Sequence, residues 1–201
     1  HEIRNPLAAA KGHAQLLAEQ IPESERQRRW VDVVVEQIER IEALSGQLLD
    51  FARGGRLQRE AVAPAELLRE AADALAAGRF AFDVERAPAS WSVDRSRLRQ
   101  VLTNLLQNAV QASPPDKPID ATAAQERGML VFTVRDRGPG LPPGEGERIF
   151  EPFHTTRLRG TGLGLAVARR LAELHGGTIE ARDHPEGGAE FRVLIPPPAE
   201  S

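Results

Sequence analysis

Residues 94–113 read DRSRLRQVLTNLLQNAVQAS, a stretch with the spacing of an amphipathic helix. Asp94 is a good helix N-cap, and Pro114 stops the helix after Ser113, so the sequence predicts a helix at Arg95–Ala112. The apolar side chains that recur at threes and fours would face a core: Val101, Leu102, Leu105 and Leu106. A helix of this length with one apolar side must pack against a sheet or other helices.

Two carboxamides lie on the polar side of the same predicted helix. Asn104 and Asn108 are four residues apart and therefore share one face. Such a ridge could hold a hydrated Mg²⁺ and phosphate oxygens without adding negative charge, because Mg²⁺ keeps several waters and takes few protein ligands. The alternative is that both side chains simply face water.

The residues around this helix alternate between helical and strand patterns. The predicted elements are helices at Pro64–Ala77 and from Gly164 to about His175, and strands at Phe80–Glu85, Trp91–Val93, Ile119–Ala123, Met129–Asp136, Thr178–Arg182 and Ala189–Ile195. This order predicts an α+β domain at residues 56–201, with a largely antiparallel sheet and helices on one face.

Residues 1–55 form a different kind of unit. Apolar stripes at helical spacing predict one helix at His1–Gln20 and a second from Ser24 to Phe51, ended by Gly54. Two such helices cannot bury their stripes against each other alone, so we expect a homodimer in which two hairpins form a four-helix bundle. The alternative is a hairpin that packs on the second domain of its own chain.

Composition excludes several classes of protein. The chain has 201 residues, and 26 Lys and Arg against 29 Asp and Glu give a net charge of −3, which argues against nucleic-acid binding. Cysteine is absent, so there is no disulfide framework and no thiolate metal site. No stretch approaches the roughly 20 apolar residues of a membrane span. The start lacks Met and resembles no signal peptide, so we expect a fragment with a truncated first helix.

The first seven residues, HEIRNPL, carry a possible nucleophile. His1 and Asn5 share a helical face, and Glu2 is adjacent. A neutral imidazole attacks through one nitrogen while a carboxylate accepts the proton of the other. The second His of a HExxH zinc motif is missing, which argues against a metalloprotease. The alternative is an incidental histidine on a solvated helix.

Two glycine-rich loops follow the helix at 95–112. In DRGPG, Asp136 ends an apolar strand, and Gly138 and Gly140 allow a close backbone approach to a ligand. A buried carboxylate there could accept from an exocyclic amino group and so distinguish adenine from guanine, or the motif could be only a turn. The second loop, GTGLGL at Gly160–Leu165, opens a helix and can bind an anion, but it is neither a Walker A loop nor a dinucleotide fingerprint.

The segment between these loops has the composition of a lid. Phe150 and Phe153 are apolar anchors in an otherwise polar stretch, and Arg157 and Arg159 could reach phosphates. An ordinary surface loop would have the same composition.

The ordered set of motifs resembles the transmitter region of two-component sensor histidine kinases, over essentially the whole chain. The matching segments are the H box at His1–Leu7, the N box at Leu102–Ala109, the G1 box at Asp136–Gly140, the F box at Ile149–Phe153 and the G2 box at Gly160–Leu165. The resemblance implies a helical dimerisation domain at 1–55 and an α/β sandwich at 56–201 that binds ATP and Mg²⁺. It also implies transfer of the phosphoryl group to a response-regulator Asp, in a cytoplasmic protein whose full-length form can be membrane-anchored.

The resemblance assigns roles residue by residue. His1 is the implied phosphoacceptor, Glu2 its base, and Asn5 a residue that helps to hydrolyse the phosphorylated partner. Asn108 is the implied Mg²⁺ ligand, with Asn104 near the phosphates and Asp136 reading the adenine amino group. The remaining implied nucleotide-binding residues are Gly138, Gly140, Arg157, Gly160, Thr161, Gly162, Leu163 and Gly164.

The sequence departs from the common pattern at two positions of the N-box helix. Gln111 and Ala112 stand where many members have a basic residue and an aromatic one, and the chain has no Tyr. Together with the short lid, this resembles the nitrogen-regulator type of kinase. Two rivals remain open: a different ATPase on the same sandwich, and a dimerisation scaffold without catalysis.

Overall fold

The computed structural model describes residues 4–22, 27–35, 37–38, 41, 56–75, 79–155 and 161–198. The chain divides into two compact units, residues 1–53 and residues 54–201, and each unit is described by itself. Within the described ranges, no helix combines the length and the apolar character needed to cross a bilayer.

The first unit is helical. Helix α1 spans Arg4–Gln20, and residues 27–35 are helical as well. The Arg28 guanidinium donates to the carbonyl oxygens of Ala18 and Ile21, so a cation from the second helical segment binds carbonyl groups at the end of α1. The predicted first helix is confirmed over residues 4–20. Ser24, where the second helix is predicted to begin, lies outside the described residues, as do residues 36, 39–40 and 42–53.

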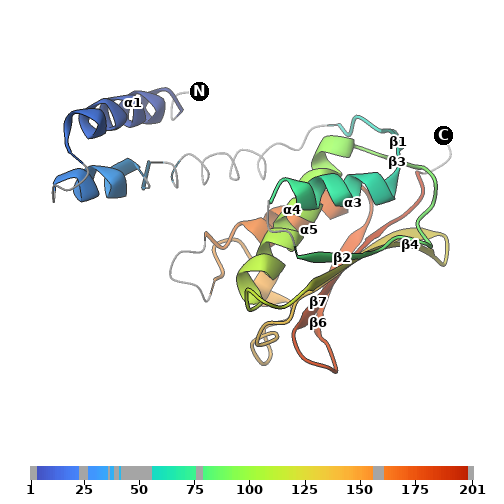
Figure 1. The fold of residues 1–201 in the computed structure, drawn as a ribbon. Coiled ribbons are helices and arrows are strands. Elements are labelled where there is room, and N and C mark those ends of the chain that lie inside the picture. Colours follow the sequence, from blue (N-terminus) through green and yellow to red (C-terminus); the bar gives the residue numbers. More distant parts are fainter. Residues whose placement is uncertain are drawn as a thin grey trace. The chain divides into compact units, whose positions relative to one another are not determined.

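The second unit is built on a five-stranded sheet in the order β2-β4-β5-β7-β6 (Figure 1). The strands are β2 at Phe80–Asp83, β4 at Ile119–Glu126, β5 at Met129–Arg135, β6 at Thr178–Asp183 and β7 at Ala189–Ile195. Among the strands of the described residues, only the edge pair β2 and β4 is parallel, so the predicted largely antiparallel sheet is confirmed.

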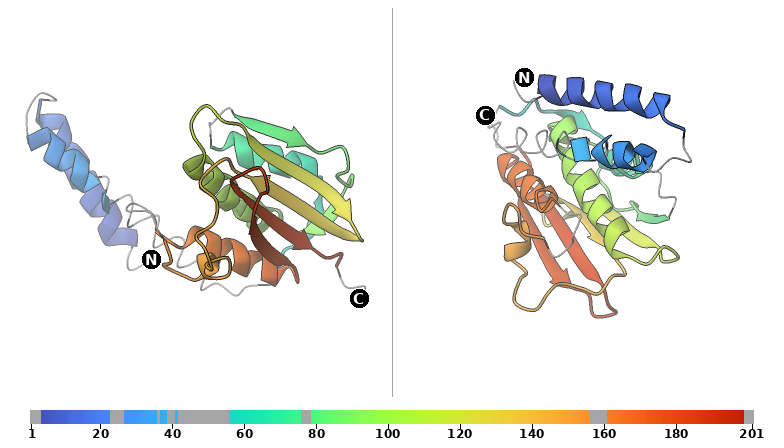
Figure 2. Two further views of the ribbon diagram at one scale, coloured as in Figure 1. Left: turned by 90° about the horizontal axis from the view of Figure 1, so that it is seen from below. Right: turned by 90° about the vertical axis from the view of Figure 1, so that its left-hand side faces the viewer.

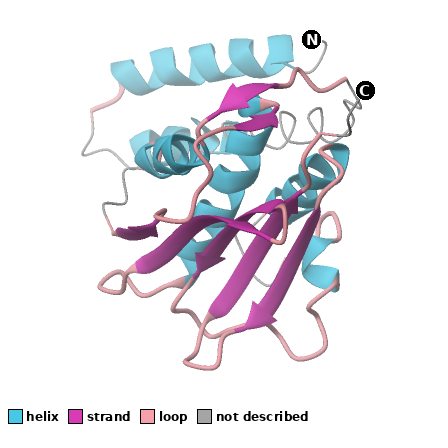
Figure 3. Cartoon of the chain, turned by 90° about the vertical axis from the view of Figure 1, so that its right-hand side faces the viewer, coloured by secondary structure: helices cyan, strands magenta, loops and turns pink. Residues whose placement is uncertain are grey.

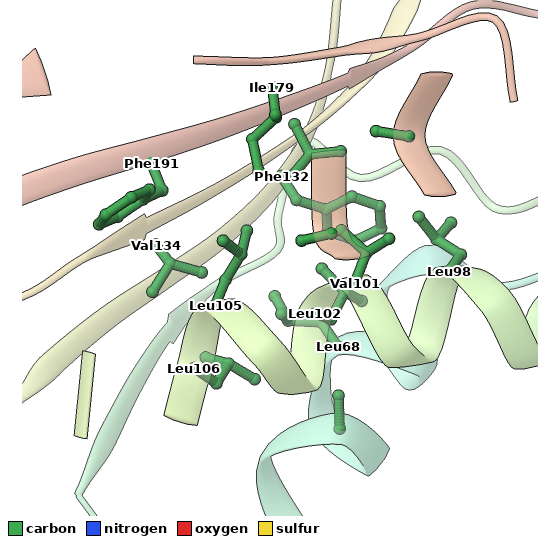
Figure 4. Close-up of a cluster of buried hydrophobic side chains, with 14 of the residues drawn as sticks. Leu68, Leu98, Val101, Leu102, Leu105, Leu106, Phe132, Val134, Ile179 and Phe191 are labelled. Atoms are coloured by element: carbon green, nitrogen blue, oxygen red, sulfur yellow. The ribbon is translucent and has the colours of Figure 1, made fainter. Parts of the chain in front are cut away.

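Three helices cover one face of this sheet. They are α3 at Pro64–Asp73, α4 at Arg95–Ala112 and α5 at Gly164–Leu174, and Figures 2 and 3 show them on the same side of the strands. Alternate residues of β5, such as Phe132 and Val134, are fully buried against α4. Figure 4 shows Leu102 and Leu105 of α4 among these side chains. The α+β architecture predicted from the sequence is therefore confirmed.

Successive side chains of a strand point to opposite faces of the sheet. The face away from the helices carries many charged residues. Charged residues on this face pair across strands or with the adjoining loops. The pairs are Arg137 with Asp120 at 2.6 Å, Arg192 with Glu126 at 2.7 Å, Arg182 with Glu190 at 2.8 Å and Arg135 with Glu186 at 3.1 Å. We call this set the ion-pair face.

Some elements differ from the sequence-based expectation. A second, two-stranded sheet pairs β3 at Trp91–Val93 with β1 at Glu60–Val62, and β1 was not predicted. Three residues are too few to show a hydrophobic period. Helix α3 ends at Asp73 rather than at Ala77, and a short 3₁₀ helix, η1, forms at Arg148–Phe150.

Asp94 caps α4, as the sequence predicts. Its carboxylate accepts from the Arg97 backbone N–H at 3.1 Å, from the Ser96 hydroxyl at 2.9 Å and from the Gln58 backbone N–H at 3.0 Å. Burial alone would raise the pKa of Asp94. The hydrogen bonds and the nearby Arg97 charge outweigh burial, so the pKa lies below the ordinary 3.8.

Replacing Asp94 with Ala is expected to lower the free energy of unfolding of the second unit by about 1–2 kcal/mol, because α4 loses its cap. Urea denaturation of the full chain, followed by Trp91 fluorescence in a Trp30→Phe background, measures this change. Since the folded-state pKa is depressed, the stabilisation is fully present above pH 3.8 and disappears as the pH falls through the lowered pKa.

The matched control is Asp116→Ala, which changes an exposed aspartate in the loop after α4. It should alter the free energy by less than about 0.5 kcal/mol. Equal effects of the two substitutions would contradict the capping role of Asp94.

Candidate functional site

Helix α4 lies at the centre of the candidate site. Asn104, Asn108 and Ala112 are four residues apart and therefore lie along one side of the helix. At 1.5 Å per residue, Asn104 and Ala112 are separated by about 12 Å along the axis. The two ends of this row contact two different loops, so α4 sets the distance between them.

At one end of the row, α4 is joined to α5. The Asn104 side-chain amide donates to the carbonyl oxygen of Gly164 at 3.0 Å. Gly164 is the first residue of α5. The structure thus brings one predicted N-box residue directly to the second glycine-rich loop.

The N-terminus of α5 is suited to an anion. No side chain caps it, and its first turn contains no acidic residue. The first N–H groups of a helix have no intrahelical acceptor, and the helix dipole adds positive potential there. Thr161 Oγ1 accepts from the Leu163 backbone N–H at 3.3 Å, which organises the turn before the helix. A phosphate group would find free backbone donors at this position.

At the other end of the row, Asp136 is buried, with 2% of its surface exposed. Its Oδ1 atom accepts from the backbone N–H groups of Gly138 at 2.8 Å and Ala189 at 3.0 Å. Within the described part of the chain, no donor is bonded to Oδ2. The carboxylate is therefore fixed by the backbone through one oxygen and can accept a ligand's hydrogen bond through the other.

The loop that follows Asp136 is pressed against the end of α4. A Cβ atom at Gly138 would lie 2.8 Å from the Ala112 carbonyl oxygen, so only glycine fits without displacement. The Arg137 backbone N–H donates to the Ser113 hydroxyl at 3.0 Å. Behind the loop, beside Gly140, Asp183 accepts from the Leu141 backbone N–H at 2.7 Å.

The segment at 149–162 confirms one predicted apolar anchor and contradicts the other. Phe150 is buried and packs edge-to-face on Phe191, with ring centroids 6.5 Å apart, while Arg169 covers its ring. Phe153 is 66% exposed, so its prediction as an anchor is wrong. Its backbone is left-handed, with a φ of +66°, and its N–H donates to the Gly162 carbonyl at 3.0 Å.

That contact closes the base of the predicted lid. Gly162 has a φ of +67°, and a Cβ atom there would lie 2.5 Å from the Phe153 carbonyl carbon. The two ends of the loop therefore meet backbone to backbone. Residues 156–160, with Arg157, Arg159 and Gly160, lie outside the described residues, as do His1 and Glu2. The Asn5 backbone belongs to α1, and its side chain also lies outside the description.

The donor groups fit a hydrated Mg²⁺ that is held mainly by a nucleotide. Among the described residues, no group of three or more His, Cys, Asp or Glu could hold a metal ion. Asn108 is half-buried, and in the same part of the chain its amide has no hydrogen-bond partner. Its oxygen is free to coordinate one cation, whose other ligands would be water and phosphate oxygens.

The sequence reasoning missed the residues that hold the site together from a distance. Ser113 and Asp183 bond to the loop after Asp136, and Ala189 donates to the Asp136 carboxylate itself, but the three residues lie in three separate parts of the chain. No local motif marks them, because each contact joins residues far apart in the sequence. Only the terminal position of Ser113, after α4, could have suggested its role.

Two family models match the chain. Residues 93–199 match the model described as histidine kinase-, DNA gyrase B-, and HSP90-like ATPase, and residues 1–56 match the His Kinase A (phospho-acceptor) domain. Among curated proteins, sporulation kinase A of Bacillus subtilis is 33% identical over 203 residues, which cover 98% of this chain and 33% of that protein. The sensor histidine kinase ZraS of Escherichia coli O157:H7 is 32% identical over 98% of this chain and 44% of its own length.

Solved structures agree with these matches. Full-length ShkA in complex with AMPPNP has a TM-score of 0.82 and 33% identity, over 98% of this chain and 44% of that one. ThkA in complex with the response regulator protein TrrA has a TM-score of 0.73 and 27% identity, over 98% of this chain and 59% of that one. The chain therefore belongs to the two-component sensor histidine kinases, as a transmitter region in which a phosphoacceptor module precedes an ATPase module. It spans less than half the length of the curated relatives named above, and the resemblance to the nitrogen-regulator type stays a prediction.

Replacing Gly138 with Ala is expected to destabilise the second unit by about 1–3 kcal/mol, because the new methyl group meets the backbone of α4. Urea denaturation of the full chain measures the loss. Gly146→Ala is the matched control, because a Cβ atom at Gly146 has no neighbour within 4 Å. A Gly138 variant as stable as the Gly146 variant would show that the loop does not press on Ala112.

Proposed function

We propose that this transmitter region binds ATP with Mg²⁺ along α4, phosphorylates His1 within a homodimer, and passes the phosphoryl group to an Asp of a response regulator. The observation that carries the proposal is the arrangement along one side of α4. A buried carboxylate that can read a base is held at the Ala112 end, and a helix N-terminus that can bind phosphate is held at the Asn104 end. The AMPPNP complex of ShkA and the regulator complex of ThkA support the two partners.

In this proposal Asp136 recognises the adenine. Its Oδ1 atom is already occupied by two backbone donors. Its Oδ2 atom accepts from the exocyclic amino group, which guanine does not offer at that position. Gly138 and Gly140 bring the backbone close to the base.

The phosphates lie at the start of α5. Backbone N–H groups at Gly162 and Gly164 supply uncharged donors, and Gly160, Thr161, Leu163 and Arg157 complete the loop. Asn104 keeps this loop against α4 through its bond to Gly164. When bound through Asn108, Mg²⁺ neutralises phosphate charge and orients the γ-phosphoryl group.

The chemical step is carried by the H box. One imidazole nitrogen of His1 forms the N–P bond to the γ-phosphorus while the bond to the bridging oxygen breaks and ADP leaves. Glu2 accepts the proton of the other nitrogen. Asn5 positions a water for a second reaction, the hydrolysis of the phosphorylated regulator.

The homodimer is formed by the helical unit. Several apolar side chains on the helical segments of residues 1–53 are about half exposed: Leu16, Leu17, Trp30, Val33, Val34 and Ile41. Exposed apolar area of this kind is costly in water and would be buried when two hairpins form a four-helix bundle. The match to the phospho-acceptor domain supports this arrangement.

Two rival functions make different predictions for the same site. A different ATPase on this sandwich would bind and hydrolyse ATP without any need of His1. A scaffold would bind no nucleotide, and the substitution of Gln111 and Ala112 for a basic and an aromatic residue favours it. Asp136 and the glycines of both loops favour nucleotide binding instead.

Incubation with γ-labelled ATP and Mg²⁺ is expected to label the full chain, and His1→Ala is expected to abolish the label. The label should be acid-labile and alkali-stable, as a phosphoramidate is. His13→Ala is the matched control, because it removes another histidine, an exposed one on α1. ATP turnover that survives in the His1 variant would identify the other ATPase, and absence of ATP binding would identify the scaffold.

Replacing Asp136 with Asn is expected to weaken ATP binding by about tenfold or more, because an amide donor then faces the adenine amino group. The fold should persist, because the Asn oxygen can still accept from Gly138 and Ala189. Calorimetric titration with ATP and with GTP measures both affinity and base preference.

The same Asp-to-Asn change at the exposed Asp116 should leave both affinities unchanged. Base recognition by Asp136 would be refuted by an Asn variant that binds ATP within about twofold of the unmodified chain.

A further inference from the structure

His175 is a buried histidine that the proposed chemistry does not use. It follows α5 directly, and only 1% of its surface is exposed. Its Nδ1 atom lies 2.8 Å from the Leu171 carbonyl oxygen, and its Nε2 atom lies 3.2 Å from the Asp94 backbone nitrogen. The carbonyl can only accept and the backbone N–H can only donate. These partners assign the neutral tautomer with the proton on Nδ1 and an acceptor lone pair on Nε2.

The surroundings favour that neutral state. Burial lowers the pKa of His175 below the ordinary 6.5, while the hydrogen bond to Leu171 and the charge of Asp94 act in the opposite direction. The other charged groups that face the ring are Arg59, from the segment before β1, and Arg97 on α4, and both disfavour a second positive charge. The imidazole therefore acts as a fixed acceptor and donor at neutral pH.

The contact to Asp94 joins the same two helices that Asn104 joins, but at their other ends. Asp94 caps the start of α4, and His175 ends α5, so the helices run antiparallel. From Asp94 to Asn104 is about 15 Å of helix, and from Gly164 to His175 about 16 Å. The bond from Asp94 to His175 and the bond from Asn104 to Gly164 are separated by nearly equal lengths of α4 and α5. Together they fix the register of the two helices.

A third segment meets this junction. The Arg59 guanidinium donates to the His175 carbonyl at 3.2 Å and to the Ser92 carbonyl at 2.9 Å. The Gln58 backbone N–H donates to the Asp94 carboxylate at 3.0 Å. Residues 56–59 begin the second unit after the helical unit, so the start of this unit is tied to both helices that carry the site.

We propose that His175 is a positioning residue of the nucleotide site: its ring holds α5 in register with α4, and its backbone carbonyl accepts from Arg59, which ties residues 56–59 to the end of α5. The inference rests on the proposed function, because the register matters for nucleotide binding only if α4 and α5 bind ATP. His175 touches no nucleotide. Loss of its Nε2 acceptor leaves the Asp94 N–H unsatisfied and reduces the fraction of molecules with the site assembled, and excess ATP restores that fraction.

The test measures autophosphorylation of the full chain as a function of ATP concentration. His175→Leu removes the acceptor and is expected to raise the half-saturating ATP concentration by about tenfold, with the rate at saturating ATP within about twofold of the unmodified chain. His175→Gln retains an acceptor that cannot titrate and is expected to restore the half-saturating concentration to within about threefold. A merely structural defect would instead lower the saturating rate by reducing the amount of folded protein.

A second pair of variants keeps the test valid if the Leu variant does not fold. Arg59→Met removes the tie from the exposed side and is expected to raise the half-saturating concentration by about threefold. Arg99→Met is its matched control, because Arg99 is an exposed arginine of α4 that makes no hydrogen bond or ion pair in the described part of the chain.

The outcomes separate the two proposals. Half-saturating concentrations that are unchanged in the folded His175→Leu variant or in Arg59→Met would overturn the positioning role, and so would a Gln variant as defective as the Leu variant. Failure of the unmodified chain to bind ATP or to label His1 would overturn the proposed function instead.

Discussion

Burial of one side of α4 is the constraint on which the second unit depends. Leu98, Val101, Leu102, Leu105 and Leu106 are fully buried among the sheet and the flanking helices. Each fully buried side chain of this kind contributes about 1.5–3 kcal/mol relative to an exposed one, so the helix can neither rotate nor slide without a large loss. The opposite side of α4 is thereby fixed in place. It carries Asn104, Asn108 and Ala112, and its two ends contact the two glycine-rich loops. The precision of the site is a consequence of packing on the side away from it.

The polar groups around this row are arranged to receive an anion without opposing it. The described residues that face the phosphate end are amides and backbone N–H groups, and the first turn of α5 has no carboxylate. The buried carboxylate of Asp136 stands at the far end of the row, and its Oδ1 atom accepts hydrogen bonds from two backbone N–H groups. About 12 Å of helix separates this carboxylate from the N-terminus of α5, so its negative charge would repel an anion bound there only weakly.

Much of this could be predicted from the sequence, because α4 combines a strong helical period, an Asp cap and a proline stop, and because the glycine loops follow in a specific order. The rest depended on contacts that the sequence does not encode locally. Strand β1 has three residues and forms only because β3 offers a partner. Phe153 is exposed, and it combines a left-handed backbone with a bond to Gly162, a residue nine positions away. The bond from Asn104 to Gly164, and those from Ser113 and Asp183 to the first glycine loop, join residues whose proximity is decided only when the sheet and helices have packed.

The ion-pair face bears on how partners are told apart. Each positive charge on it is matched by a neighbouring negative one, so its field is short-ranged, and a screening length of about 8 Å at physiological salt confines it further. A surface of this kind stays hydrated and neither steers nor repels an approaching protein. Recognition of another protein would then have to rest on other surfaces of the chain, where charge or apolar area is left unmatched.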